Sequence, residues 1–179
     1  MSNRSVLALY LLLILITFAV SAHGPSRQKV IKDVVINAPA ARVWAIVADF
    51  CSISKWHPAV ADCTNEGGNA VGATRTLRIG AADGPAIEEQ LQAYDATGMS
   101  YKYKIAKTDD TVLPVNTYSA FLTVLDNGDG TSKVEWKSGF YRAFPNNNPP
   151  PELSDEAALK AVTGVFEAGL ANLKTLAEH

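Results

Sequence analysis

The chain has 179 residues, of which 47% are hydrophobic, and its 16 lysines and arginines face 18 aspartates and glutamates. This length suits one domain with a substantial core, and the formal net charge of −2, without any basic stripe, excludes the electrostatic signature of nucleic-acid-binding proteins. The two cysteines lack the C-x-x-C spacing of metal and redox motifs, so we predict neither a metal site nor a cofactor.

Residues 1–22 have the three parts of a secretory signal peptide. Arg4 gives a positive start, an apolar run of 15 residues follows, and Ser21 and Ala22 are the small residues that a signal peptidase reads. Cleavage there leaves a domain of residues 23–179 with 15 basic and 18 acidic side chains. We therefore expect a periplasmic or secreted protein with no stable membrane insertion after cleavage. An uncleaved membrane anchor is the alternative, since the apolar stretch reaches the lower length limit of a spanning helix.

A strand and two short helices are predicted at the start of the domain. Residues 30–37 are rich in Val and Ile, which favour strands. Pro39 suits the first turn of a helix, where its missing N–H would have no partner, and apolar residues then repeat with helical spacing over residues 39–48. A second short helix over residues 52–56 ends before Pro58.

Six further strands are expected along the middle of the chain. The segments are 59–65, 73–79, 86–94, 99–107, 118–125 and 133–142. The sequence Asp-Asn-Gly-Asp-Gly at residues 126–130 predicts a hairpin between the last two. Alternating apolar and polar residues between tight turns are typical of an antiparallel sheet with one dry face.

A long helix is predicted at the C-terminal end, after an extended proline-rich segment at residues 144–151. Ser154 is a good N-cap, and an apolar stripe with helical period runs to about residue 177. Gly164 and Gly169 interrupt this helix. They indicate either that the helix backbone comes close to, or bends over, another group, or simply that the helix packs tightly on the sheet.

The two cysteines, Cys51 and Cys63, are candidates for a disulfide, because exported proteins keep such bonds. The bond would fasten the end of the first helical segment to the next strand. The alternative is a pair of buried thiols that act as small apolar groups.

The element order and several short motifs resemble the START/Bet v 1-like superfamily, also called SRPBCC or polyketide cyclase/dehydrase and lipid-transport proteins. The motifs are Ile36-Asn37-Ala38-Pro39 with Val43-Trp44, Trp56-His57-Pro58, Gly72-Ala73-Thr74-Arg75, and Glu88-Glu89-Gln90-Leu91 with Tyr94-Asp95. The segment from Pro145 to Leu153 and the start His23-Gly24-Pro25 are similar to the MxaD branch, whose members are accessory proteins of bacterial methanol oxidation.

The resemblance implies an α+β helix-grip fold: a curved antiparallel sheet of six or seven strands, two short early helices, and a long C-terminal helix over a cavity. It implies a non-enzymatic accessory or ligand-binding protein that supports methanol oxidation, with a methanol dehydrogenase and its c-type cytochrome as partners. The alternatives are a carrier of a lipid or small hydrophobic ligand and an enzyme similar to polyketide cyclases or dehydratases.

The inward faces of the expected strands and last helix supply the candidate cavity residues. They are Arg75, Leu77, Ile79, Glu89, Leu91, Tyr101, Tyr103, Tyr118, Trp136, Ser138, Val162, Phe166 and Leu170. Arg75 and Glu89 are expected to pair, because an isolated buried charge is costly. The pair would either orient a ligand or only bridge two strands. No catalytic residue is predicted, since no nucleophile, base and orienting group stand together; His57 is expected to pack at the end of a helix.

Overall fold

The protein is described by a computed structural model that covers residues 24–179. The signal peptide and anchor hypotheses concern residues outside this range. Within it, no helix is both long and apolar enough to cross a membrane.

Seven strands form one antiparallel sheet in the order β1-β7-β6-β5-β4-β3-β2. The strands are β1 (Gln28–Ile36), β2 (Val60–Glu66), β3 (Thr74–Ile79), β4 (Ala86–Asp95), β5 (Ser100–Lys107), β6 (Val115–Asp126) and β7 (Ser132–Arg142). The short helices α2 (Ala40–Val47) and α3 (Ile53–Trp56) connect β1 to β2, which form the two edges of the sheet. The helix-grip prediction is confirmed.

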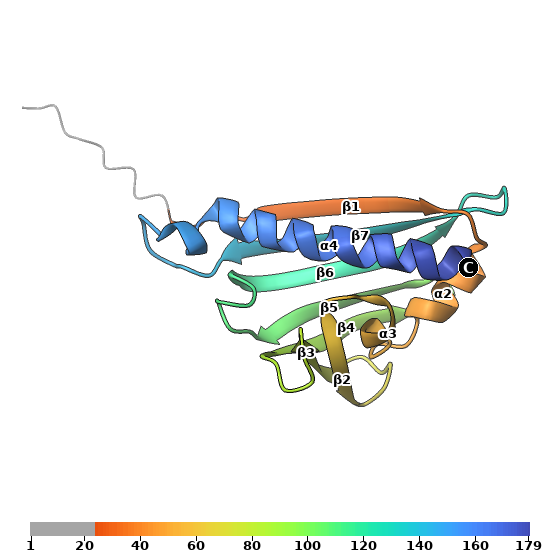
Figure 1. Cartoon of the computed structure of the whole chain (residues 1–179), viewed down its shortest axis with the longest axis horizontal. Helices are drawn as coiled ribbons and strands as arrows, with labels where there is room; N and C mark the ends of the chain where they lie inside the picture. Colours follow the sequence, from red (N-terminus) through yellow and green to blue (C-terminus); the bar gives the residue numbers. More distant parts are fainter. Residues whose placement is uncertain (1–23) are drawn as a thin grey trace, which may run out of the picture.

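The long helix α4 (Asp155–Glu178) lies along one face of the sheet, roughly parallel to β1 (Figure 1). It follows the 3₁₀ turn η1 (Pro151–Leu153), and the Ser154 hydroxyl accepts a hydrogen bond from the Ala157 N–H as predicted for an N-cap. Its apolar stripe packs inward, and the Phe166 ring stacks on Trp136 of β7 with 4.2 Å between centroids. An ion pair of 2.6 Å between Lys32 and Glu167 joins α4 to β1.

The two glycines of α4 have different surroundings. A Cβ added to Gly169 would lie 2.6 Å from Cδ2 of His57 and 3.0 Å from Cζ3 of Trp136. Gly164 is exposed, and a Cβ there would meet nothing within 4 Å. The close approach that the sequence allowed therefore exists at Gly169, where the helix backbone lies against the imidazole ring.

Several element boundaries differ from the sequence prediction by one to three residues, and two of these differences have a clear local reason. β6 begins at Val115, three residues before the predicted start. Its register shifts between Asn116 and Ser119, and Thr117 has a φ of 50°. This bulge breaks the alternation that marks a strand. Pro39 is the N-cap of α2 rather than its first helical residue, with ψ at 145°.

Candidate functional site

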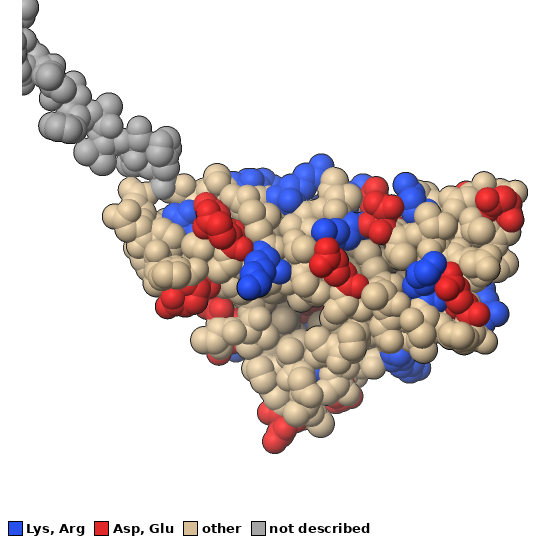
Figure 2. Space-filling view, turned by 45° about the horizontal axis from the view of Figure 1, so that its top comes forward, with Lys and Arg blue, Asp and Glu red and all other residues tan. Residues whose placement is uncertain are grey.

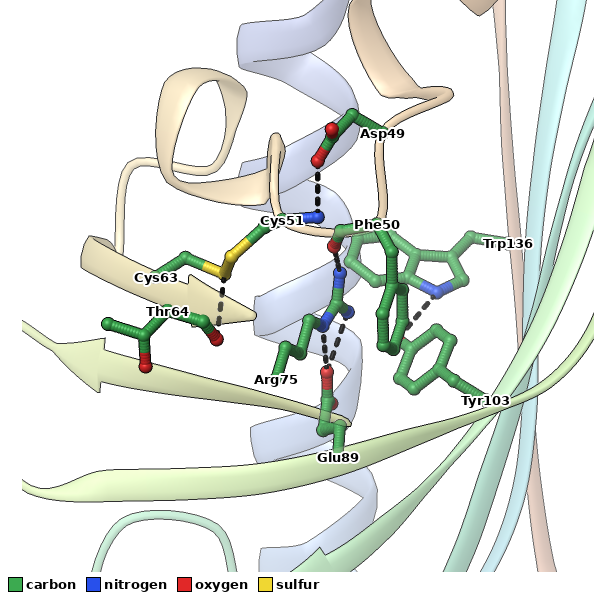
Figure 3. Close-up of polar contacts among 9 residues, drawn as sticks. All are labelled: Asp49, Phe50, Cys51, Cys63, Thr64, Arg75, Glu89, Tyr103 and Trp136. Atoms are coloured by element: carbon green, nitrogen blue, oxygen red, sulfur yellow. Dashed lines mark hydrogen bonds and ion pairs between the residues drawn. A yellow bond between two sulfur atoms is a disulfide. The ribbon is translucent and has the colours of Figure 1, made fainter. Parts of the chain in front are cut away.

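A buried ion pair lies between the neighbouring strands β3 and β4. Arg75 and Glu89 face each other directly in the strand register, and both Nε and Nη2 of Arg75 lie 2.6 Å from Oε2 of Glu89. Arg75 is 1% exposed and Glu89 5%. Nη1 of Arg75 donates to the Phe50 carbonyl, so the guanidinium is held from two sides (Figure 3).

Phe50 covers the Arg75 end of this pair. The guanidinium carbon lies 4.0 Å from the centroid of the Phe50 ring and 5.0 Å from that of Tyr103. The next residue, Cys51, forms a disulfide with Cys63 of β2, with 5.7 Å between their Cα atoms. The disulfide thus fastens the segment that carries Phe50 to the edge of the sheet (Figure 3).

The Glu89 carboxylate keeps one free oxygen. Oε2 takes both contacts from Arg75, while no hydrogen bond within residues 24–179 engages Oε1. Burial raises the pKa of the Glu89 carboxyl, and the Arg75 charge opposes this effect. Glu89 also lines the interior cavity, so it offers a hydrogen-bond acceptor to any molecule inside.

The cavity beneath α4 has a volume of about 80 Å³. Its walls are Ile53, His57, Ala59, Val60, Leu77, Ile79, Ile87, Glu89, Tyr103, Ile105, Val112, Leu113, Tyr118, Trp136 and Val165. Ala59 is exposed and Val112 and Val165 are half-buried, which places the mouth between α4, the start of β2 and the loop of residues 108–114. An 80 Å³ space is well below the ~300 Å³ at the lower end of ordinary ligand sites.

Six of the thirteen predicted cavity residues line this space. They are Leu77, Ile79, Glu89, Tyr103, Tyr118 and Trp136. The other seven lie in the structure away from the cavity wall: Arg75, Leu91, Tyr101, Ser138, Val162, Phe166 and Leu170. The Trp136–Phe166 stack fills the region under the middle of α4, and Phe50 fills the space beside Arg75. Bulky aromatic side chains thus occupy much of the room that the sequence assigned to a ligand.

His57 is part of the cavity wall, but both of its ring nitrogens are engaged. Nε2 lies 2.9 Å from the Val165 carbonyl, and Nδ1 accepts the Ala59 N–H at 3.2 Å. This pattern requires a neutral ring with its proton on Nε2. Burial lowers the pKa of His57, and the nearby Arg75 charge lowers it further. The imidazole therefore fixes α3 against α4 and has no free nitrogen to serve as a base.

The buried tyrosines are neutral hydroxyl groups. Burial raises the pKa of Tyr101 to about 12 and raises those of Tyr103 and Tyr118 as well. The Tyr103 hydroxyl accepts a hydrogen bond of 3.1 Å from Nε1 of Trp136 (Figure 3). Tyr103 and Tyr118 thus bring polar tips to a mostly apolar wall.

Some wall residues were missed by the sequence analysis. Ile87 shares a strand face with Glu89 and could have been found from its alternation. Val112 and Leu113 lie in the loop between β5 and β6, where no periodic pattern reports which side chains turn inward. In the described part of the chain, no group of three or more His, Cys, Asp or Glu side chains is placed to hold a metal ion.

A curved sheet that holds a C-terminal helix over a small interior cavity defines a protein of the helix-grip class. Residues 27–178 match the family described as polyketide cyclase/dehydrase and lipid transport, and the chain belongs to that family. No curated protein matches the sequence.

Solved structures from several organisms share the fold. Protein XoxI from Bacillus cereus is 26% identical with a TM-score of 0.69, over 83% of this chain and 94% of that one. The Zhui aromatase/cyclase from Streptomyces sp. R1128 is 18% identical with a TM-score of 0.67, over 86% and 94%. Norcoclaurine synthase from Thalictrum flavum, in complex with dopamine and hydroxybenzaldehyde, is 14% identical with a TM-score of 0.63, over 85% and 87%.

Proposed function

We propose that this protein binds a small, largely apolar molecule in the cavity beneath α4, and that Oε1 of Glu89 accepts a hydrogen bond from its polar end. The observation that carries the proposal is a carboxylate oxygen that has no hydrogen bond from residues 24–179, on a side chain that lines a mostly apolar cavity. A ligand inside the cavity that donates an O–H or N–H to Oε1 would form a hydrogen bond to a charged acceptor, and such bonds contribute ~1.5–3 kcal/mol.

The cavity volume limits the size of the ligand. A cavity of ~150 Å³ with apolar walls binds benzene, and the space here is about 80 Å³. This comparison favours molecules of about four non-hydrogen atoms, such as a short-chain alcohol or amine. Four such atoms at the ceiling of ~1.5 kcal/mol per non-hydrogen atom give at most ~6 kcal/mol, so we expect a dissociation constant no lower than about 40 μM. A phenol would fit only if Val112 and Leu113 moved outward.

A size series tests the proposal. Methyl NMR spectra of the purified protein would be recorded during titrations with propan-1-ol, phenol and 1-naphthol. We expect saturable shifts at Ile87 and Leu113 with propan-1-ol, weaker ones with phenol and none with 1-naphthol. Ile87→Phe, which fills the cavity, should abolish the propan-1-ol shifts. Shifts that do not saturate, or that persist in Ile87→Phe, would contradict an interior site.

An enzyme similar to cyclases or dehydratases is the second candidate. Its support is the raised pKa of Glu89, a property of general bases in dry sites, together with the family description. Glu89→Gln should then abolish turnover of an aromatic polyketide substrate. Glu88→Gln is the matched control, because Glu88 precedes Glu89 on β4 but its side chain is 49% exposed. Binding of the substrate without turnover in the unaltered protein would count against this candidate.

We also infer that the protein acts outside the cytoplasm as an accessory protein of methanol oxidation. Its support is the signal-like pattern of residues 1–22, the Cys51–Cys63 disulfide, which suits an oxidising compartment, and the resemblance to the MxaD branch. A pull-down with methanol dehydrogenase and its c-type cytochrome tests the partner. Failure to form any complex would remove the accessory role but leave the cavity proposal standing.

A further inference from the structure

The face of the sheet that is turned away from α4 has a groove with basic walls. The groove has a volume of about 520 Å³ and is lined by Arg27, Gln28, Lys29, Lys102, Ser119, Ala120, Phe121, Lys137, Ser138 and Gly139. A smaller space next to it, of about 370 Å³, adds Lys104. Five basic side chains therefore gather on a molecule whose formal net charge is −2. This corrects the sequence analysis, which expected no basic stripe, because the five residues come from separate segments that only the sheet brings together.

The strand register explains the shape of the groove. Lys29 of β1 pairs with Gly139 of β7, Gly139 with Ser119 of β6, and Ser119 with Lys104 of β5. In this row, lysines therefore stand on the two outer strands, and between them lie Gly139, which has no side chain, and the small Ser119. Adjacent strands are ~4.8 Å apart, so the backbones of the two outer strands, β1 and β5, are ~14 Å apart. The groove runs along β6 and β7.

Gly139 has a specific part in this arrangement. A Cβ at this position would lie 2.7 Å from Nη2 of Arg27. The absence of a side chain therefore lets the Arg27 guanidinium lie over the strand, at the edge of the floor. In the next register row, Lys137 pairs with Phe121, whose ring lies 5.0 Å from the Lys137 ammonium, and Phe121 pairs with Lys102.

Most of these charges have no acidic partner. No ion pair or hydrogen bond joins the side chains of Arg27, Lys29, Lys102 or Lys104 to another of residues 24–179, and all four residues are exposed. Lys137 alone is paired, with Glu135 at 3.2 Å. Figure 2 shows a different pattern over the α4 side of the molecule, where acidic and basic side chains are interspersed.

We propose that this basic groove binds a carboxylate-rich segment of a partner protein, which lies along β6 and β7 between the two walls. The unpaired cations stand at both outer strands, Lys29 on β1 and Lys102 and Lys104 on β5, so a segment that carries several carboxylates can engage more of them at once than one small anion can. Single-stranded nucleic acid needs exposed aromatic rings for base stacking, and the Phe121 ring lies beneath Lys137. This inference does not depend on the cavity beneath α4.

The test is the binding of a fluorescein-labelled hexaglutamate peptide, measured by anisotropy at low ionic strength, where charge interactions are weakly screened. The variants are Lys102→Glu with Lys104→Glu on one wall, and Arg27→Glu with Lys29→Glu on the other. The matched control is Lys55→Glu with Lys160→Glu, which makes the same change in net charge at exposed lysines outside the groove. We expect each wall variant to lose at least tenfold in affinity and the control to lose less than twofold.

Two arms of the experiment separate the kinds of partner. A thymidine decanucleotide and vesicles of phosphatidylglycerol would be titrated in the same buffer. Tighter binding of either probe than of the peptide, with the same dependence on the wall residues, would overturn the assignment to a protein partner. An equal loss of peptide affinity in the wall variants and the control would show that net charge alone causes the effect. That result would overturn the proposal that the groove is the binding site. Circular dichroism of each variant verifies the fold, and the two walls provide independent results.

Discussion

At the scale of single residues, the contacts of the Arg75–Glu89 pair are compatible both with a structural role between β3 and β4 and with a role in ligand binding. Arg75 contacts one carboxylate oxygen of Glu89, and the other oxygen of this cavity-lining side chain has no hydrogen bond from residues 24–179. A buried pair contributes little net stability compared with apolar residues of similar size, but the loss of one partner leaves an uncompensated buried charge. The pair therefore makes the fold sensitive to changes at either residue.

Glu89→Gln should lower the free energy of unfolding by about 3–5 kcal/mol, because the Arg75 charge would remain buried without its partner. The double variant Arg75→Met with Glu89→Leu should lose less than the single one, since no charge is left in the core. Urea denaturation measures both. The control is the exposed ion pair between Glu88, which precedes Glu89 on β4, and Lys107 of β5, 3.8 Å apart. Lys107→Met, which removes this exposed pair, should leave the free energy of unfolding nearly unchanged. A double variant that is less stable than Glu89→Gln would contradict this reasoning.

The other residue-scale prediction concerns pH and His57. Burial lowers the pKa of this ring in the folded protein, so the unfolded chain binds a proton more readily than the folded one. The free energy of unfolding should therefore fall as the pH drops below about 6.5. His57→Gln removes this titration, so its stability should change less between pH 7.5 and pH 5 than that of the unaltered protein. If the free energy of unfolding changed equally with pH in the two proteins, the His57 ring would not be held neutral in the folded state.

At the scale of elements, α4 and the α2–α3 segment determine how much space remains inside. The sequence specified these elements well, because helical and strand periods, a hairpin motif and the Ser154 cap are local signals. It could not indicate that Phe50 lies over Arg75, or that Leu113 turns inward, because such placements depend on loop paths. Strand alternation put Tyr101 and Ser138 on the inward face, yet inward side chains mostly pack against one another.

The two glycines of α4 provide a matched comparison. Gly164→Ala should stabilise the protein by up to ~1 kcal/mol, because alanine favours helix and the position is open. Gly169→Ala should destabilise it by ~1–3 kcal/mol, because the new methyl group would collide with His57, which is held by hydrogen bonds at both nitrogens. Thermal unfolding of the two variants is the measurement. Equal effects of the two substitutions would refute the close approach at Gly169.

The disulfide fastens the Phe50 segment at the other side of the core. Replacement of both Cys51 and Cys63 by serine should lower the free energy of unfolding by ~3 kcal/mol, as expected for a loop closed over 12 positions. The Tyr101 and Tyr103 signals should also change in NMR spectra, because Phe50 contacts both rings. Unchanged stability would indicate that packing alone holds this segment.

At the scale of the whole molecule, the described part of the chain has a small space beneath α4, lined by an acceptor without a hydrogen bond from residues 24–179, and a basic groove on the opposite face of the sheet. The two features are on different sides of the sheet and make separate predictions. The first concerns a small ligand and the second a protein partner. The family relationship establishes the architecture, whereas side chains particular to this chain determine the size of the cavity.

The most direct measurement is the electron density of a crystal soaked in propan-1-ol. The account predicts one alcohol molecule beneath α4, with its hydroxyl oxygen ~2.5–3.0 Å from Oε1 of Glu89 and its carbon chain against Ile87 and Leu113. A cavity that holds no alcohol at saturating concentration, or an alcohol whose hydroxyl lies away from Glu89, would contradict it.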